Sequence, residues 1–429
     1  MAERAGWPEM LELDLHGFAQ GGYAVGRWQG RPVFARGGLP GERVLVRLSE
    51  RAQSLARGDV VEVLSASPAR IASPGVESQD CIGCDWQHIA YEAQLAGKAH
   101  ILRDQLVYLG RVADPDIRTP IPSEPWGYRT TARLHVAGAQ IGFYAPGTRR
   151  LVPIDQSPLL HPLLNNAIST LQPLLPIPDL REVTLRASLA DQTVMGLFHG
   201  GDRQILKERA GRWHAALPAL SGTAVTTRKG WALLSGEAYL YEQMGSLRLR
   251  LSPVSFFQAN VPLAQAMLDA VREALALQAG DRLLDAYCGA GTFILPLARS
   301  SPLAGAVGIE ENPFAVEDAR ASAVEAGIDG VRIIAGRVED VLPELMKVER
   351  FTAALLDPPR RGMEPAALQA LIAHRPTRIA YISCHPGTLA RDIRALVEAG
   401  YRLRFAQPFD FFPQTSHVET LSLLDWSGG

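Results

Sequence analysis

Two short motifs near the C-terminus carry side chains that can act as a nucleophile and as a base. Cys384 follows the apolar run 378–383 and precedes a Pro-Gly turn, so its thiol sits at a strand end beside the start of a helix. A partly exposed cysteine in such a position favours the thiolate, whereas the alternative is a small core residue. In SHVETLSLL, a period of two places His417 and Glu419 on one face of a strand. Glu419 is either a functional carboxylate or a salt-bridged structural one.

A glycine-rich turn provides a candidate cofactor site. The sequence LLDAYCGAGTF carries Asp285, Tyr287, Gly289 and Gly291 between a predicted strand and a helix. Backbone N–H groups of such a turn lie close to a bound cofactor, and Glu310, about twenty residues on, can bind the ribose hydroxyls. The turn lacks the full glycine set of dinucleotide sites. It therefore favours an adenosine cofactor without a pyrophosphate, namely S-adenosylmethionine.

A further carboxylate follows the fourth strand of the same region. Asp357 lies in LLDPPRRGM, where the adjoining prolines stiffen the turn and remove two N–H donors. The alternative is an ordinary strand-ending Asp-Pro turn. Enzymes that methylate exocyclic amines place an aromatic residue after a similar motif, and Arg360 stands there instead. This residue argues against an amine target.

These groups together suit methylation of C5 of a pyrimidine. That carbon is too weakly nucleophilic to take a methyl group directly, and addition of a thiolate to C6 activates it. A base must then remove the C5 proton so that the thiol can leave. Cysteine, carboxylate and S-adenosylmethionine site are the three parts that this chemistry requires.

The elements that must position these residues form an alternating pattern. Near-continuous apolar strands separated by helices predict a parallel sheet covered on both faces. We expect a doubly wound, Rossmann-like α/β domain whose last strand is inserted antiparallel. Asn260 and Pro262 predict a helix that runs to Gly280. The predicted strands are 282–286, 305–309, 331–335, 353–357, 378–383, 401–407 and 417–425.

The N-terminal part has a different character. Short apolar runs separated by glycine turns predict a small barrel of five strands, and residues 91–109 predict a helix that stops at Gly110. Residues 127–250 mix strands and helices. We therefore divide the chain into a barrel (1–66), an α+β central domain (67–250) and a catalytic domain (251–429).

Composition excludes several classes of protein. The 429 residues carry 43 Lys+Arg against 45 Asp+Glu, and only 4 cysteines. Few cysteines exclude a disulfide scaffold and favour the cytoplasm. The sequence shows neither a secretory signal nor an apolar stretch long enough for a membrane span. A net charge of −2 excludes bulk polybasic binding but permits local basic surfaces.

The motifs together resemble the RNA uracil-5-methyltransferase family. GFAQGGYAVGRWQGRPVFARGGLPGERV resembles its TRAM domain, an RNA-binding barrel of the oligonucleotide-binding type. WGYRTTARLHV resembles the start of its central domain, and SFFQAN the entry to its methyltransferase domain. DAYCGAG, LLDPPRRG, SCHPGTLARD and HVET follow in the family's order.

The resemblance implies a role for individual residues. Cys384 matches the family's nucleophile and Glu419 the base that removes the C5 proton. Gln258, Tyr287, Glu310 and Asp357 match positions that contact S-adenosylmethionine. His385 departs from the family, because an asparagine usually follows the nucleophile.

A larger departure concerns metal. Many members hold a [4Fe–4S] cluster with four cysteines. This chain keeps Cys81 and Cys84, but has Gly75 and Ser157 at the other two positions. Two thiols cannot supply the ligand set of a cluster, and a zinc site with His88 still lacks a ligand. We expect no metal, with the cysteine pair a structural relic.

The expected partner is structured RNA, bound by a monomer. A target base must be flipped out to reach Cys384, and 23S rRNA is favoured over the tRNA T-loop because a TRAM-like unit is usual in the rRNA enzymes. Cytosine-5 methylation and a non-catalytic RNA-binding protein are the competing interpretations. Arginines of the barrel and central domain would hold the RNA, or serve only as surface charges: Arg27, Arg31, Arg36, Arg129 and Arg133.

Overall fold

The computed structural model describes residues 6–72, 83–145 and 147–428. The chain divides into two compact units. The first contains Met1–Pro122 together with Cys384–Arg394 and Ala406–Thr420. The second contains Ser123–Ser383, Ala395–Phe405 and Leu421–Gly429. Each unit is described separately, and the linear division at residues 66 and 250 stays a prediction.

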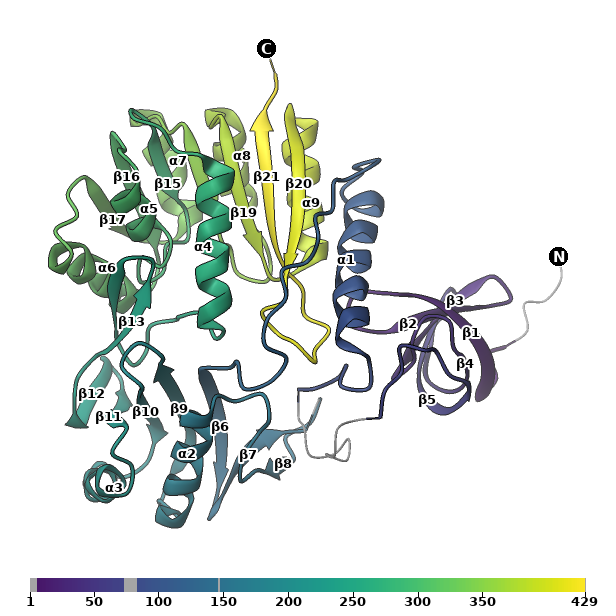
Figure 1. Ribbon diagram of the computed structural model, residues 1–429, viewed down its shortest axis with the longest axis horizontal. Helices are drawn as coiled ribbons and strands as arrows, with labels where there is room; N and C mark the ends of the chain where they lie inside the picture. Colours follow the sequence, from purple (N-terminus) through teal and green to yellow (C-terminus); the bar gives the residue numbers. More distant parts are fainter. Residues whose placement is uncertain (1–5, 73–82, 146, 429) are drawn as a thin grey trace. The chain divides into compact units, whose positions relative to one another are not determined.

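The first unit contains the expected barrel. It is closed, with strand order β1-β2-β3-β5-β4 (Figure 1). Leu11, Leu13 and Leu15 of β1 are buried and alternate with exposed residues, which is the pattern of a strand with one face toward a core. The strands are β1 (Met10–Phe18), β2 (Ala24–Trp28), β3 (Arg31–Arg36), β4 (Arg43–Arg51) and β5 (Ala56–Ser65).

Helix α1 (Tyr91–Tyr108) belongs to the same unit and confirms the helix predicted from the sequence. Ile101 of the helix shares a buried cluster with the barrel. The rings of Phe18 and Trp86 lie 4.7 Å apart in that cluster. A Cβ at Gly97 would come within 2.8 Å of the Phe18 ring, so this glycine lets the helix approach the barrel closely.

The second unit begins with a mixed sheet of strand order β12-β11-β10-β9-β6-β7-β8. Its core is formed by leucines and valines of the strands with helices α2 and α3. The strands are β6 (Thr131–Ala137), β7 (Gln140–Tyr144), β8 (Leu151–Pro153), β9 (Leu180–Ser188), β10 (Thr193–Gly200), β11 (Leu220–Thr227) and β12 (Gly230–Gly236). The helices are α2 (Pro162–Leu171), the short 3₁₀ helix η1 (Gln172–Leu174) and α3 (Arg203–Ala216). A hairpin, β13 (Leu240–Met244) with β14 (Leu247–Leu251), follows.

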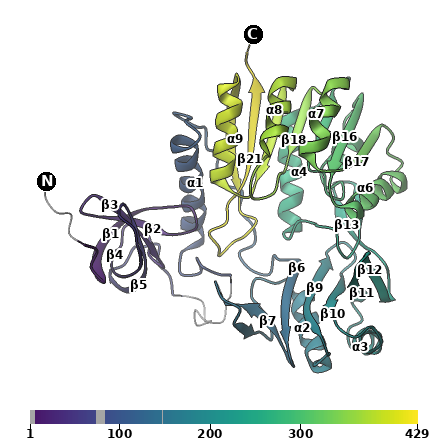
Figure 2. The same cartoon turned by 180° about the vertical axis from the view of Figure 1, so that it is seen from behind.

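The C-terminal sheet has the strand order β17-β16-β15-β18-β19-β21-β20. The order reverses at β15 and β18, and the last strand lies between β19 and β20, which confirms the doubly wound fold with an inserted strand. Helix α4 lies on one face, and α7 and α8 on the other (Figures 1 and 2). The strands are β15 (Arg282–Asp285), β16 (Gly305–Glu310), β17 (Val331–Ala335), β18 (Ala353–Leu356), β19 (Arg378–Ser383), β20 (Tyr401–Phe409) and β21 (Glu419–Trp426). The helices are α4 (Val261–Leu275), α5 (Ile294–Ser300), α6 (Pro313–Glu325), α7 (Val338–Val348), α8 (Pro365–His374) and α9 (Pro386–Glu398).

Helix α4 begins as predicted but ends early. The Asn260 side chain accepts a hydrogen bond from Leu263 N and caps the first turn. The predicted end at Gly280 is wrong, because Ala276 adopts a left-handed conformation directly after Leu275. The guanidinium of Arg378 donates to the carbonyl oxygens of Leu275 and Ala276, and thereby satisfies the exposed end of the helix.

Within the described part of the chain, we find no helix whose length and hydrophobicity would let it span a membrane.

Candidate active site

The glycine-rich turn after β15 exposes its backbone as the sequence predicts. Gly289 and Gly291 have φ angles of 54° and 85°, which favour glycine. A Cβ at Gly291 would lie 2.6 Å from Leu295 Cδ1, whereas a Cβ at Gly289 would meet nothing within 4 Å. Gly291 is therefore required by packing. Gly289 leaves open backbone that a cofactor can approach.

Glu310 holds this turn from the end of the neighbouring strand. Its Oε2 accepts a hydrogen bond from Gly289 N at 3.0 Å, and its Oε1 accepts one from Asn312 N at 2.7 Å. Burial raises the pKa of the Glu310 carboxyl, and these backbone donors oppose the rise. The structure thus brings Tyr287, in the turn after β15, and Glu310, at the end of the adjacent strand β16, to one edge of the sheet.

Two further carboxyl groups lie at the same edge. Asp285 ends β15 and accepts a hydrogen bond from Tyr287 N at 3.3 Å through Oδ1, while its buried Oδ2 has no hydrogen-bond partner among the described residues. Burial is the main cause that raises the pKa of Asp285 to about 8, and the charges of Asp357 and Glu310 contribute to the same rise. Burial also raises the pKa of Asp357, after the adjacent strand β18, to about 7. A concentration of raised carboxyl pKa values is typical of a functional site.

Gln258 lies in a segment that a buried carboxylate holds in place. Asp318 of α6 accepts hydrogen bonds from Ser252 N at 2.7 Å and from Ser255 Oγ at 2.6 Å. It also pairs with the Arg250 guanidinium. Because α6 starts three residues after Glu310, this network ties the segment that carries Gln258 to the strand that carries Glu310.

The end of that segment is anchored as well. Ala259 O accepts hydrogen bonds from Thr130 N and Thr130 Oγ1, at 2.8 Å and 3.1 Å. Asn260 Nδ2 donates to Ser123 Oγ at 2.8 Å. The SFFQAN motif is therefore a rigid connection within the second unit.

Cys384 and Glu419 belong to the first compact unit. Cys384 follows β19 directly and is half-buried. Its neighbour His385 starts helix α9, because the His385 carbonyl accepts from Leu389 N and the ring Nδ1 accepts from Thr388 N at 3.2 Å. His385 thus serves as the N-terminal cap of the helix beside the nucleophile candidate. An asparagine at this position could accept the same bond.

Glu419 is the first residue of β21 and is half-buried. Val418 and Thr420 on either side are buried, whereas His417 is exposed. This alternation agrees with the two faces expected from the sequence. Glu419 therefore lies on the less buried face at the very start of the strand.

The sequence motifs did not predict the roles of two carboxyl groups in this region, Asp285 and Asp318. Asp285 was visible in the motif, but only its burial shows that its carboxyl is held protonated at neutral pH. Asp318 stands in an unremarkable helical stretch, and its partners are more than 60 residues away in sequence. The only sequence signal for it was an acidic residue on a buried helix face.

Several arginines expected to bind RNA already have internal partners. The Arg31 guanidinium lies over the rings of Trp7 and Trp28, 4.0 Å and 4.7 Å from their centroids. Arg36 pairs with Asp59 at 3.4 Å, and Arg133 pairs with Glu182. In each case the guanidinium already has a partner within the protein.

The expected metal ligands lie partly outside the described residues. Cys81 and Gly75 belong to the stretch 73–82, which the structure does not describe. Ser157 is buried, and its backbone N–H donates to Asn165 Oδ1 at 2.9 Å. Among the residues that are described, no cluster of His, Cys, Asp or Glu is arranged as a metal site. The absence of an iron–sulfur cluster stays a prediction.

Comparison with known proteins identifies the family. The family model described as tRNA (uracil-5-)-methyltransferase matches residues 237–426. An uncharacterized RNA methyltransferase of Thermosynechococcus vestitus is 33% identical, over 97% of this chain and 98% of the relative. A 23S rRNA (uracil(1939)-C(5))-methyltransferase of Alkalilimnicola ehrlichii is 34% identical, over 97% of this chain and 96% of the relative. The chain belongs to the RNA uracil-5-methyltransferase family.

A solved structure supports the fold of this RNA uracil-5-methyltransferase family member. The tRNA (uracil-54, C5)-methyltransferase of Pyrococcus abyssi, in complex with S-adenosyl-L-homocysteine, superimposes with a TM-score of 0.75 at 24% identity. The match covers 96% of this chain and 99% of that structure. The family and fold expected from the sequence motifs are confirmed.

Proposed function

We propose that this protein transfers a methyl group from S-adenosylmethionine to C5 of a uracil in 23S rRNA. The observation that carries the proposal is the combination of a cysteine after β19 and a carboxylate at the start of β21 with an acid-lined glycine turn after β15. We also propose that the protein acts as a cytoplasmic monomer. The rRNA substrate is supported by the 34% identical relative.

The cofactor residues suit an adenosine ligand. Tyr287 can pack against the adenosine, Glu310 can accept from the ribose hydroxyls, and Gln258 and Asp357 can bind the remaining polar groups. The motif supplies no cationic side chain for a pyrophosphate, and the open backbone at Gly289 permits close approach. When bound, S-adenosylmethionine supplies an electrophilic methyl group.

The chain's own residues would then act in sequence. The Cys384 thiolate adds to C6 of the flipped uracil, and the electrons of the C5=C6 bond become available at C5 for methylation. Glu419 removes the proton from the methylated C5. The electron pair of that C–H bond restores the double bond, and the C6–S bond breaks to release the Cys384 thiolate.

Tritium release from uracil C5 tests this reaction. Purified protein, S-adenosylmethionine and RNA labelled with tritium at uracil C5 should release tritium to water, and mapping should place the methylated uridine in 23S rRNA. Cys384→Ala should abolish release, and Glu419→Gln should trap a covalent protein–RNA adduct. Absence of release from every rRNA and tRNA would refute the proposal. Release from tRNA alone would replace the rRNA substrate with the T-loop.

A further inference from the structure

The segment that leads into Glu419 is an unusually buried loop. Residues 410–418, here called the base loop, connect β20 to β21 within the first compact unit. Several of its side chains are at most 6% exposed: Asp410, Phe411, Gln414, Thr415 and Val418. A connection this deeply buried needs partners for its polar groups, since unpaired buried polar groups are costly.

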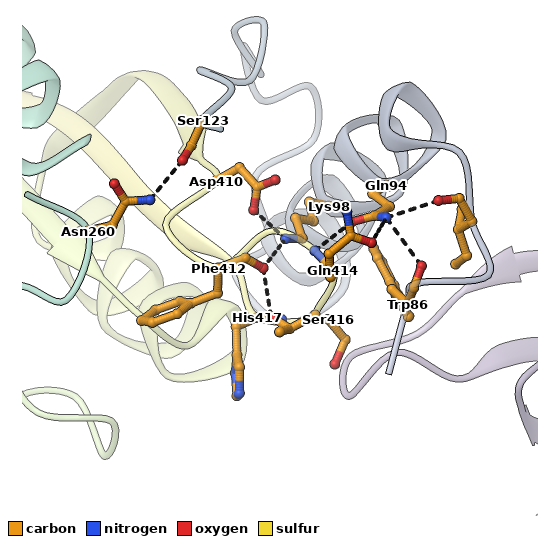
Figure 3. Close-up of polar contacts among 12 residues, drawn as sticks. Trp86, Gln94, Lys98, Ser123, Asn260, Asp410, Phe412, Gln414, Ser416 and His417 are labelled. Carbon is orange, nitrogen blue, oxygen red and sulfur yellow. Dashed lines mark hydrogen bonds and ion pairs between the residues drawn. The ribbon is translucent and has the colours of Figure 1, made fainter. Parts of the chain in front are cut away.

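One set of partners is an amide pair with helix α1. Gln94 Nε2 donates to Gln414 Oε1, and Gln414 N donates back to Gln94 Oε1, both at 2.9 Å (Figure 3). Gln94 is fully buried, and its amide also donates to Ile89 O at 2.9 Å. Trp86 N donates to Gln414 O at 3.0 Å. The backbone and side chain of Gln414 are thus fixed from one side.

The second set of partners is a buried ion pair from the next turn of the same helix. Lys98 Nζ pairs with Asp410 Oδ1 and donates to Phe412 O at 3.0 Å (Figure 3). Lys98 and Asp410 are each 1% exposed. Thr415 Oγ1 also donates to Phe412 O, at 2.7 Å, and accepts from His417 N at 3.3 Å. The bonding therefore continues along the loop to within two residues of Glu419.

We propose that Gln94 and Lys98 are positioning residues for Glu419, holding the base loop so that the carboxylate can take the C5 proton. This inference rests on the proposed function. Both residues lie on one face of α1, four positions apart, and their bonds reach the start and the middle of the loop. A base held by a rigid neighbouring element keeps the geometry that proton transfer requires, and small displacements are costly in rate.

One contact of the base loop lies at the surface and can be removed without disturbing the core. Ser416 N donates to Asp85 Oδ1 at 3.2 Å, and Asp85 is exposed. Asp85→Ala removes this anchor of the base loop without opening the core. Asp85→Asn keeps an acceptor oxygen and is its matched control.

The experiment separates proton removal from the earlier steps. Methyl-labelled S-adenosylmethionine reports RNA methylation and any methylated covalent adduct on denaturing gels, and tritium at uracil C5 reports proton removal. In Gln94→Ala, we expect tritium release to slow by about ten- to a hundredfold while the methylated adduct accumulates. Asp85→Ala should also slow tritium release and accumulate methylated adduct, but to a smaller extent. Asp85→Asn should behave as wild type.

A barrel variant controls for stability. Arg70→Met removes the partner of the buried Glu42 carboxylate in the same unit, as Lys98→Met removes the partner of Asp410. Arg70→Met should lower stability without adduct accumulation, and Lys98→Met should accumulate adduct.

The Gln94→Ala/Gln414→Ala double variant should be no slower than either single variant, because the two amides act through each other.

The outcomes distinguish the two proposals. If wild type forms no adduct and releases no tritium, the proposed function fails. If wild type turns over but the Gln94, Lys98 and Asp85 variants lose methylation and tritium release in equal proportion, or keep both, the positioning role is overturned.

Discussion

At the scale of single residues, Asp285 has a strongly raised carboxyl pKa. Its pKa is raised to about 8, and that of Asp357 is raised to about 7. Both shifts arise chiefly from burial, which disfavours the charged form. The neutral Asp285 relieves repulsion among carboxyl groups that are held at one edge of the sheet.

Asp285→Asn should reduce the dependence of stability on pH. In wild type the folded carboxyl binds a proton that the unfolded one releases near pH 3.8, so stability falls as pH rises from about 4 to about 8. Asparagine cannot ionise and keeps the Oδ1 acceptor for Tyr287 N. Since each pKa unit corresponds to about 1.4 kcal/mol, the variant should gain a few kcal/mol relative to wild type at pH 9. Urea unfolding at pH 5, 7 and 9 measures this, and parallel curves would contradict it.

His385 is the second residue whose role can be isolated. Its ring accepts from Thr388 N at the start of α9, and its other ring nitrogen pairs with Gln20 of the barrel. Replacing a capping side chain by alanine costs about 1 kcal/mol. We expect His385→Ala to lower the free energy of unfolding by about that amount, and His385→Asn to lie closer to wild type. Equal losses in both variants would show that the cap is not the stabilising contact.

At the scale of elements, strand β3 presents an aromatic surface of the barrel. The rings of Tyr23 and Phe34 meet edge to face at 6.5 Å, and Arg57 lies over Phe34 at 5.9 Å. Aromatic rings flanked by arginines on a small barrel are suited to stacking on unpaired bases. The same surface carries the Arg36–Asp59 pair, which includes one of the arginines predicted to hold RNA.

Phe34→Ala should therefore weaken RNA binding. Stacking is worth about 1–3 kcal/mol per base, so the dissociation constant should rise by roughly five- to a hundredfold. Fluorescence anisotropy with a short uridine-rich single strand measures the change. Val61→Ala removes another exposed apolar side chain from the same barrel and should leave the affinity unchanged. An equal effect of both variants would exclude a specific role for the ring.

Elements with regular local patterns were predictable from the sequence. The barrel strands alternate, so a barrel of five strands was predictable, and the parallel strands of the C-terminal sheet are continuously apolar and lie close to their predicted ranges. The end of α4 was not predictable, because the Arg378 guanidinium that satisfies its last carbonyls comes from a strand 102 residues away. Local propensity cannot report a partner that the fold supplies.

The same limit applies to the site at the scale of the whole molecule. Motif order placed Cys384, Glu419 and the acid-lined turn at strand ends, since a strand end is a local property. Nothing in the sequence pairs Lys98 with Asp410 or Gln94 with Gln414, residues separated by 312 and 320 positions. Such contacts depend on how the chain closes on itself. The residues that do chemistry were therefore easier to predict than the residues that hold them.

The charge balance of the whole chain leads to a last prediction. The net charge is −2, and barrel arginines are paired with acids: Arg43 with Glu12 at 2.6 Å and Arg57 with Glu50 at 2.7 Å. Each phosphate contact to a single strand adds about −0.7 to the slope of log K against log salt concentration. We expect a slope shallower than about −4, because stacking rather than bulk charge would supply much of the affinity.

Salt titrations of two variants separate these contributions. Arg27→Gln should make the slope shallower by about 0.7, since Arg27 is one of the arginines predicted to hold the RNA backbone and its guanidinium donates to the Gly30 carbonyl rather than to an acid. Phe34→Ala should weaken binding at every salt concentration and leave the slope unchanged, because stacking releases no counterions. A wild-type slope steeper than about −6 would instead mean that at least eight phosphates are neutralised. Binding would then depend on a basic surface beyond the barrel, and the aromatic surface of β3 would be secondary.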